Sequence, residues 1–237
     1  MVRNSAPAPT GFHGFTPRTL EFLHNLSQNN DRDWFQAHKA QYERDVLEPA
    51  LDFIQALEPP LARISPRLLC IPKRMGGSLL RIYRDTRFAH DKRPYKTNVG
   101  MHFRHEAFRD IHGPGCYFHI GLDECFIGCG IWQPDPDTAT KIRQHILDSP
   151  RTWQAAKRVV AGTSPFEFHG AVMKRVPRGF PPDHRAIEDL KRKDFLVVRN
   201  FDEGRLYAPD IVDFTVEHFA QSAPLMRFLC TSLGAKF

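Results

Sequence analysis

The stretch RDTRFAHDKRPYKTN, residues 84–98, concentrates charged side chains in one short segment. Five Lys or Arg residues stand against two Asp, which leaves a local charge of +3 with the single His neutral. An arginine guanidinium can bind a phosphate or carboxylate through two parallel N–H donors, whereas a lysine ammonium acts as a point charge. The segment therefore predicts a pocket for an anionic small molecule, phosphorylated or carboxylated.

Each polar residue of this segment has an expected role. Two Asp side chains would orient the cations that bind the anion, and Tyr95 would line the pocket; those cations are Arg84, Arg87, Lys92 and Lys96. A second basic stretch, KRVPRGF (174–180), can face the first and adds Lys174, Arg175 and Arg178. The expected ligand-binding residues are Arg84, Asp85, Arg87, Asp91, Lys92, Tyr95, Lys96 and Arg178.

The sequence leaves open whether the site catalyses a reaction. If it does, His90 or His184 would be the general acid or base, and the cations would stabilise developing negative charge. No Walker loop, dinucleotide-binding glycine motif, G-x-S-x-G or H-E-x-x-H is present, so the residues needed for those familiar mechanisms are missing.

Two other functions fit the same residues. In the first, the two basic segments follow the phosphates of a nucleic acid, and Trp34, Phe88 or Tyr95 stack on its bases. In the second, the protein is a structural or protein-interaction module, and the charged segment is a buried ionic network that fixes the loop.

No metal or cofactor is expected. Cys116, His119, Cys125 and Cys129 suggest zinc, but alternation along the strands places His119 on the face opposite the three cysteines. The dipeptide His90-Asp91 lies in a loop bounded by proline, where a helical His-Asp metal dyad cannot form.

Composition indicates an ordered protein in a reducing compartment. The 237 residues are 41% hydrophobic and 25% charged, with a net charge of +6 that favours anionic partners. Five widely spaced cysteines fit free thiols. The opening residues MVRNSAPAPT lack the apolar core of a signal peptide, and no run approaches the ~18 apolar residues of a membrane span. We expect a soluble, cytoplasmic protein that does not enter a membrane; its oligomeric state is left open.

Helices are expected at both ends of the chain. Apolar spacing and capping residues predict helices over residues 17–27, from Asp31 to Pro59, from Pro136 to about 147, and from Pro150 to about 162. Further helices are expected to begin at Asp183, Asp210 and Pro224. Strands are expected at 68–71, 79–84, 99–104 and 195–201, in addition to a hairpin within 116–131.

That hairpin has the most specific pattern. A tight turn at Leu122-Asp123 would pair Ile120 with Cys125, Phe118 with Ile127 and Cys116 with Cys129. All six side chains would then point to one face of the sheet. The sequence therefore predicts an α+β fold, a single domain over residues 15–237 with a mainly antiparallel sheet and helices from both termini packed on it, after a disordered tail at 1–14.

The segments SQNNDRDWF, IYRDTRFAHDKRPYKTN, FIGCGIW and KRVPRGFPPDH resemble the family known as domain of unknown function 2461, which occurs in bacteria and fungi. The resemblance runs from about residue 14 to residue 233. It implies a single globular unit and brings no established activity. Its signature positions are Asn29, Asn30, Trp34, Arg84, Asp85, Arg87, Phe88, Asp91, Lys92, Pro94, Tyr95, Lys96, Gly179 and Phe180.

Overall fold

The computed structural model describes residues 11–237, so most of the expected N-terminal tail lies outside the described residues. The described end of that tail is packed. Phe12 is buried with its ring 5.1 Å from the ring of Phe15 and 5.4 Å from that of Phe53. The packed part of the chain therefore begins before residue 15.

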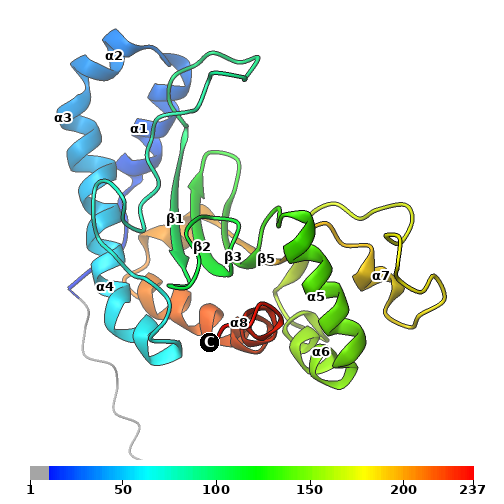
Figure 1. Ribbon diagram of the computed structural model, residues 1–237. Coiled ribbons are helices and arrows are strands. Elements are labelled where there is room, and N and C mark those ends of the chain that lie inside the picture. The colour runs from blue at the N-terminus through cyan, green and yellow to red at the C-terminus, as the bar shows by residue number, and fades with distance from the viewer. Residues whose placement is uncertain (1–10) are drawn as a thin grey trace, which may run out of the picture.

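A five-stranded antiparallel sheet forms the centre of the protein, and its strand order is β1-β2-β3-β5-β4 (Figure 1). The strands are β1 (Asn98–Arg104), β2 (Gly115–Gly121), β3 (Cys125–Ile131), β4 (Glu167–His169) and β5 (Phe195–Phe201). The β2–β3 hairpin has the expected register, in which Ile120 pairs with Cys125, Phe118 with Ile127 and Cys116 with Cys129. The predicted α+β class with a mainly antiparallel sheet is confirmed.

Helices from the N-terminal part form one side of the molecule. They are α1 (Pro17–Gln28), α2 (Arg32–Ala37), α3 (Lys39–Tyr42), the π-helical turn η1 (Glu43–Leu47) and α4 (Glu48–Ile64). The expected stop at Pro59 was wrong, because α4 continues through Pro59 and Pro60. Leu57 and Leu61 are both fully buried, so the apolar surface that the continued helix buries outweighs the two backbone donors that the prolines lack.

The C-terminal part is also mainly helical. It contains α5 (Pro136–Asp148), α6 (Pro150–Ala156), η2 (Lys157–Val160), α7 (Ile187–Leu190), η3 (Glu203–Tyr207) and α8 (Ile211–Ser232). The helix expected from Asp183 begins at Ile187, after a turn in which the Ala186 N–H donates to Nδ1 of His184. No new helix begins at Pro224, which lies inside α8 because the apolar stripe of this helix continues through Leu225 and Leu229.

The two strands expected at 68–71 and 79–84 are not formed as strands. The chain makes isolated bridges there, between Leu68 and His105, Leu79 and Met101, and Tyr83 and Tyr95. Near Leu79 the backbone still follows the edge of the sheet, because the N–H of Leu80 donates to Gly100 and the N–H of His102 donates to Ser78.

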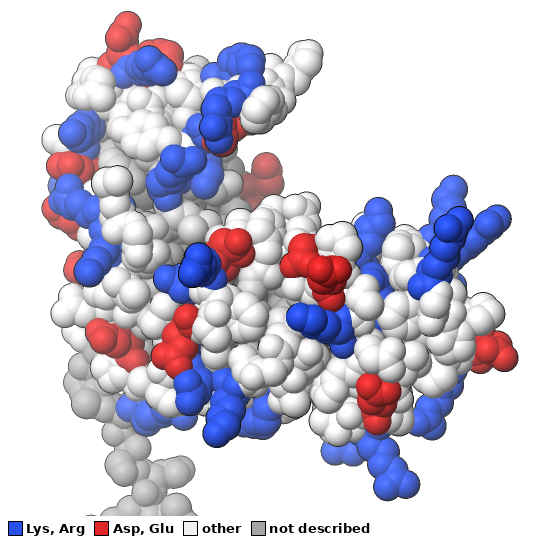
Figure 2. Space-filling model, in the orientation of Figure 1, with Lys and Arg blue, Asp and Glu red and all other residues white. Residues whose placement is uncertain are grey.

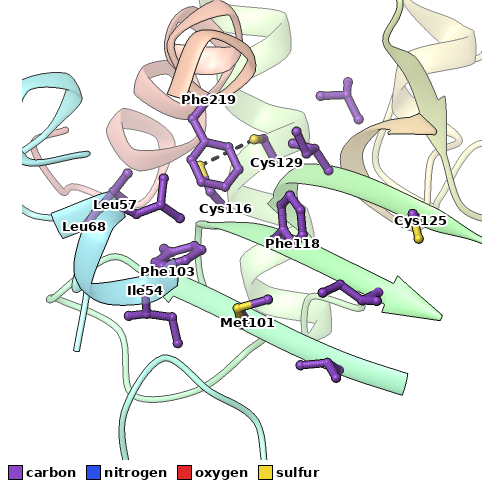
Figure 3. Packing of buried hydrophobic residues seen from close by; sticks show 14 of the residues in the cluster. Ile54, Leu57, Leu68, Met101, Phe103, Cys116, Phe118, Cys125, Cys129 and Phe219 are labelled. Carbon is purple, nitrogen blue, oxygen red and sulfur yellow. Dashed lines mark hydrogen bonds between the residues drawn. The ribbon is translucent and has the colours of Figure 1, made fainter. Parts of the chain in front are cut away.

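One face of the sheet is covered by helices and forms the core (Figures 1 and 3). Phe103 of β1 packs edge-on against Phe219 of α8, with ring centres 5.6 Å apart. Phe118 of β2 packs against Phe53 of α4, with ring centres 4.7 Å apart. The buried thiols of Cys116 and Cys129 lie on this face 3.4 Å apart and form a hydrogen bond, so both are free cysteines that fill the core.

The opposite face of the sheet has no covering helix, and the molecule is concave there (Figures 1 and 2). The charged loop that precedes β1 projects on one side, and the loops around α7 project on the other. Among the described residues, no helix has the length and apolar character needed to cross a membrane.

Candidate functional site

Alternation along the strands sends a distinct set of side chains to the open face of the sheet. The register aligns them in rows that run across the strands. One row contains Gly100, His119, Phe126 and Asn200, and the next contains His102, Tyr117, Gly128 and Val198. Two histidines, a tyrosine and a phenylalanine are therefore neighbours although they come from three different strands.

These rows form the floor of a hollow with a volume of about 590 Å³. Volumes of this size are typical of small-molecule sites. Leu80, Ile111, Trp132, Leu196 and Val198 make much of its lining apolar. Its polar lining residues are Arg84, Asp85, Lys96, Asn98, His102, Tyr117, His119, Glu124, His169 and Asn200.

One wall of the hollow is a projecting segment, residues 82–96, which we name the charged arm. Its base is a short two-stranded ladder, in which the N–H of Arg84 donates to Pro94 and the N–H of Lys96 donates to Ile82. Tyr95 packs its ring 4.1 Å from that of Phe35, which fixes one face of this ladder to α2. Alternation then places Arg84 and Lys96 together on the other face, which lines the hollow.

Three of the arm's five cations pair with its two carboxylates, so part of its charge is neutralised within the arm. Nη1 of Arg84 donates to Asp91 at 2.7 Å, and Arg93 donates to the same carboxylate at 2.9 Å. Arg87 donates through Nε and Nη2 to Asp85 at 3.0 and 2.7 Å. Hydrogen bonds from Arg87 lower the pKa of Asp85 to about 2. Those from Arg93 and Arg84 hold the pKa of Asp91 well below its usual range.

Lys96 differs from Arg84, the other cation of the arm that lines the hollow. No carboxylate of the described residues lies within ion-pair distance of its ammonium group, and the side chain is half-buried. Burial, and then the positive charge of Arg81, lowers the pKa of Lys96. Both effects make the charged form of Lys96 less favourable than that of an exposed lysine.

The structure brings only part of the expected site together. Of the ten residues named from the sequence, Arg84, Asp85 and Lys96 line the hollow. The side chain of Lys92 donates to the carbonyl of Thr86 within the arm, and Tyr95 is buried against α2. The remaining candidates are outside the lining: Arg87, His90 and Asp91 in the arm, and Arg178 and His184 in the loops before α7. Figure 2 shows that basic side chains gather on both projecting parts.

Sequence reasoning did not name His102 or Tyr117, and it considered His119 only as a zinc ligand. Burial lowers the pKa of His119 to about 4, and burial together with Arg104 lowers the pKa of His102 to about 4. Burial, and then the charge of Glu124, raises the pKa of Tyr117 to about 12. All three side chains are therefore uncharged near pH 7. The alternation of side chains along the hairpin is a signal for two of them, because it places Tyr117 and His119 on the face opposite the buried cysteines.

Among the residues that the structure describes, no group of three His, Cys, Asp or Glu side chains is arranged to hold a metal ion. Tyr117 Oη and His119 Nδ1 lie 3.3 Å apart, and the His119 ring stacks on Phe126 at 4.5 Å. The floor is therefore a cluster of rings with neutral hydrogen-bonding atoms, next to one cation without a carboxylate partner.

Comparison with known proteins identifies the family of the chain. No curated protein and no solved structure matches the chain. One family model, described as a conserved hypothetical protein (DUF2461), matches residues 18–228, a range that contains the charged arm and all five strands. The chain therefore belongs to the DUF2461 family of conserved hypothetical proteins.

Proposed function

We propose that this protein binds an anionic small molecule, phosphorylated or carboxylated, in the hollow on the open face of its sheet. The observation that supports this most directly is Lys96, a half-buried cation that lines the hollow and has no carboxylate partner among the described residues. Arg84 lies on the same side of the arm and keeps Nη2 and Nε available beside its bond to Asp91.

The size and lining of the hollow fit a ligand of moderate size. A volume of about 590 Å³ is large enough for a metabolite of drug-like size, and the apolar walls would exclude water from around the anion. Removing water strengthens the interaction between the ammonium group and an anion, because the local dielectric falls. Asp85 is held by Arg87, which limits its repulsion of an incoming anion.

A binding screen with charge-matched variants tests the proposal. The probes are inorganic phosphate, ribose 5-phosphate, phosphoenolpyruvate, citrate and the four ribonucleoside monophosphates, measured by thermal shift and by the fluorescence of Trp132, which lines the hollow. We expect at least one probe to stabilise the wild-type protein, the Lys96→Met variant to lose that effect, and Lys92→Met to keep it. Lys92 is the matched control because it lies in the same arm outside the hollow.

Two outcomes would overturn the proposal. One is a wild-type protein that responds to no probe, or a response that Lys96→Met retains. The other is tighter binding of a single-stranded oligonucleotide than of any small probe, with a steep salt dependence to which Lys92, Arg87 and Arg178 each contribute. That second result would assign the basic segments to a nucleic acid.

A further inference from the structure

The floor of the hollow is unusually rich in rings. His102, Tyr117, His119, Phe126 and Trp132 all line it, and they come from β1, β2 and β3 and the residue that follows β3. His119 and Phe126 form a stacked pair whose ring planes differ by 12°. The Tyr117 ring lies 5.7 Å from Phe126 and 5.9 Å from His119. Aromatic groups arranged in this way favour a ligand that is itself planar.

Glycines of the neighbouring strands let two of these rings lie along the sheet. A Cβ atom at Gly100 would stand 2.2 Å from Tyr117 Oη, so the phenol of β2 reaches across β1 in the space that a side chain would fill. A Cβ atom at Gly115 would stand 2.3 Å from Nε2 of His102, which reaches across β2 in the opposite direction. Because these two rings lie along the sheet and do not project from it, the space above them stays open.

The polar atoms on the floor can form hydrogen bonds with the edge of an uncharged heteroaromatic ring. Neutral imidazole has one nitrogen that donates and one that accepts, as the edge of a nitrogen heterocycle does. His102 has no hydrogen-bond partner for its ring among the described residues, and His119 uses Nδ1 with Tyr117 and leaves Nε2 for a ligand. Asn98 and Asn200 add amide groups at opposite edges of the floor.

From this arrangement we infer that the ligand is a planar heteroaromatic ring joined to an anionic group, as in a nucleoside monophosphate. The ring would lie against Tyr117 and Phe126, and the anion would contact Lys96. This inference rests on the proposed function for the anion and adds the ring. Stacking on an aromatic side chain raises affinity for a base by roughly tenfold, so each half of the ligand should contribute measurably.

Calorimetric titration with matched probes separates the two halves. The probes are the four ribonucleoside monophosphates, the four corresponding nucleosides and ribose 5-phosphate. We expect at least one monophosphate to bind the wild-type protein about tenfold or more tightly than both its nucleoside and ribose 5-phosphate. If ribose 5-phosphate binds as tightly as every monophosphate and its binding depends on Lys96, the inference of a heteroaromatic ring is wrong and the proposed function stands. If nucleosides bind as tightly as monophosphates and Lys96→Met has no effect, the proposed anion site is wrong. If no monophosphate binds, the inference is overturned.

Gly128 offers a way to fill the floor without disturbing the fold. A Cβ atom there would meet its nearest neighbour, Cδ1 of Leu196, at an ordinary 3.5 Å, whereas the space above it belongs to the hollow. We expect Gly128→Val to weaken monophosphate binding about tenfold or more and to leave ribose 5-phosphate binding unchanged. Gly128→Ala gives a smaller loss, and Gly204→Ala, on the exposed surface with no atom near its Cβ, gives none. Equal affinity of wild type and a folded Gly128→Val for a monophosphate would place the ring elsewhere.

Discussion

The side chain of Asn30 pairs with the backbone of Tyr95 as a strand would. Its Nδ2 donates to the Tyr95 carbonyl at 3.1 Å, and its Oδ1 accepts from the Tyr95 N–H at 3.0 Å. The two residues are 65 positions apart, so this pair ties the loop between α1 and α2 to the base of the charged arm. Lys96 follows directly, and its position over the hollow depends on this attachment.

Loss of the Asn30 amide should destabilise the protein. Asn30→Ala leaves one donor and one acceptor of a buried residue without partners, so we expect the free energy of unfolding to fall by about 2–3 kcal/mol. Asn29→Ala removes a single exposed hydrogen bond to the Asn25 carbonyl and should cost less than about 0.5 kcal/mol. Urea denaturation measures both. Equal stability of the two variants would show that the pair does not hold the arm.

Two glycines of β3 should differ sharply in their tolerance of alanine. Gly130 has a φ of +137°, and a Cβ there would stand 2.1 Å from the Phe195 carbonyl oxygen, so Gly130→Ala forces the backbone of β5 to move. We expect it to cost about 3 kcal/mol or more. Gly128→Ala meets ordinary contacts and should change stability by less than about 1 kcal/mol. Thermal melts of both variants test this, and a Gly130→Ala protein as stable as Gly128→Ala would contradict the described register.

Asp189 should be essential for the packing of α6 and α7. It is buried and accepts hydrogen bonds from Trp153 Nε1 and Lys157 Nζ, each at 2.8 Å. Asp189→Ala leaves a buried indole N–H and a largely buried ammonium without their partner, so we expect a loss of about 3–5 kcal/mol. The neighbouring Glu188 makes only an exposed pair with Lys191, and Glu188→Ala should cost less than about 1 kcal/mol. Guanidinium denaturation compares the two; similar losses would mean that Asp189 is not a buried acceptor.

Stability should fall between pH 6.5 and pH 4 because of His102 and His119. Burial lowers the pKa of each from 6.5 to about 4, so in this window the unfolded chain binds protons that the folded protein does not. Each histidine should remove on the order of 3 kcal/mol by pH 4. The carboxylate of Asp85, with its pKa lowered to about 2, contributes stability that is lost only as the pH falls below its usual value near 3.8. The two effects therefore occupy separate pH ranges.

Chemical denaturation at pH 4.5, 5.5 and 7.0 measures this dependence. His102→Gln and His119→Gln should each flatten the curve over that range, whereas His24→Gln, which removes an exposed imidazole, should leave its slope as in the wild type. Identical slopes in all four proteins would show that the floor histidines can be protonated freely in the folded state.

The sequence predicted those elements whose pattern is repeated over several residues. In the β2–β3 hairpin three successive pairs agree in phase, and the structure has each of them. Proline was the main source of error. Pro59 and Pro224 each suggested a helix boundary, but Leu57, Leu61 and Leu225 are fully buried, and this tertiary packing outweighs the local preference.

The candidate site was only partly visible in the sequence for a different reason. The charged arm is contiguous, so Arg84, Asp85 and Lys96 could be read from one segment. Which of its cations are neutralised depends on three-dimensional pairing, and local sequence does not distinguish Lys96 from Arg87. His102, Tyr117 and Phe126 come from three strands, and only the register of the sheet makes them neighbours.

The position of α8 determines when the core can form during synthesis. This helix, Ile211–Ser232, covers the buried face of the sheet through contacts such as that of Phe219 with Phe103. A nascent chain in which all five strands have formed still exposes the part of that face that α8 covers, until α8 has left the ribosome. We therefore expect the partly made protein to expose apolar core surface late in translation.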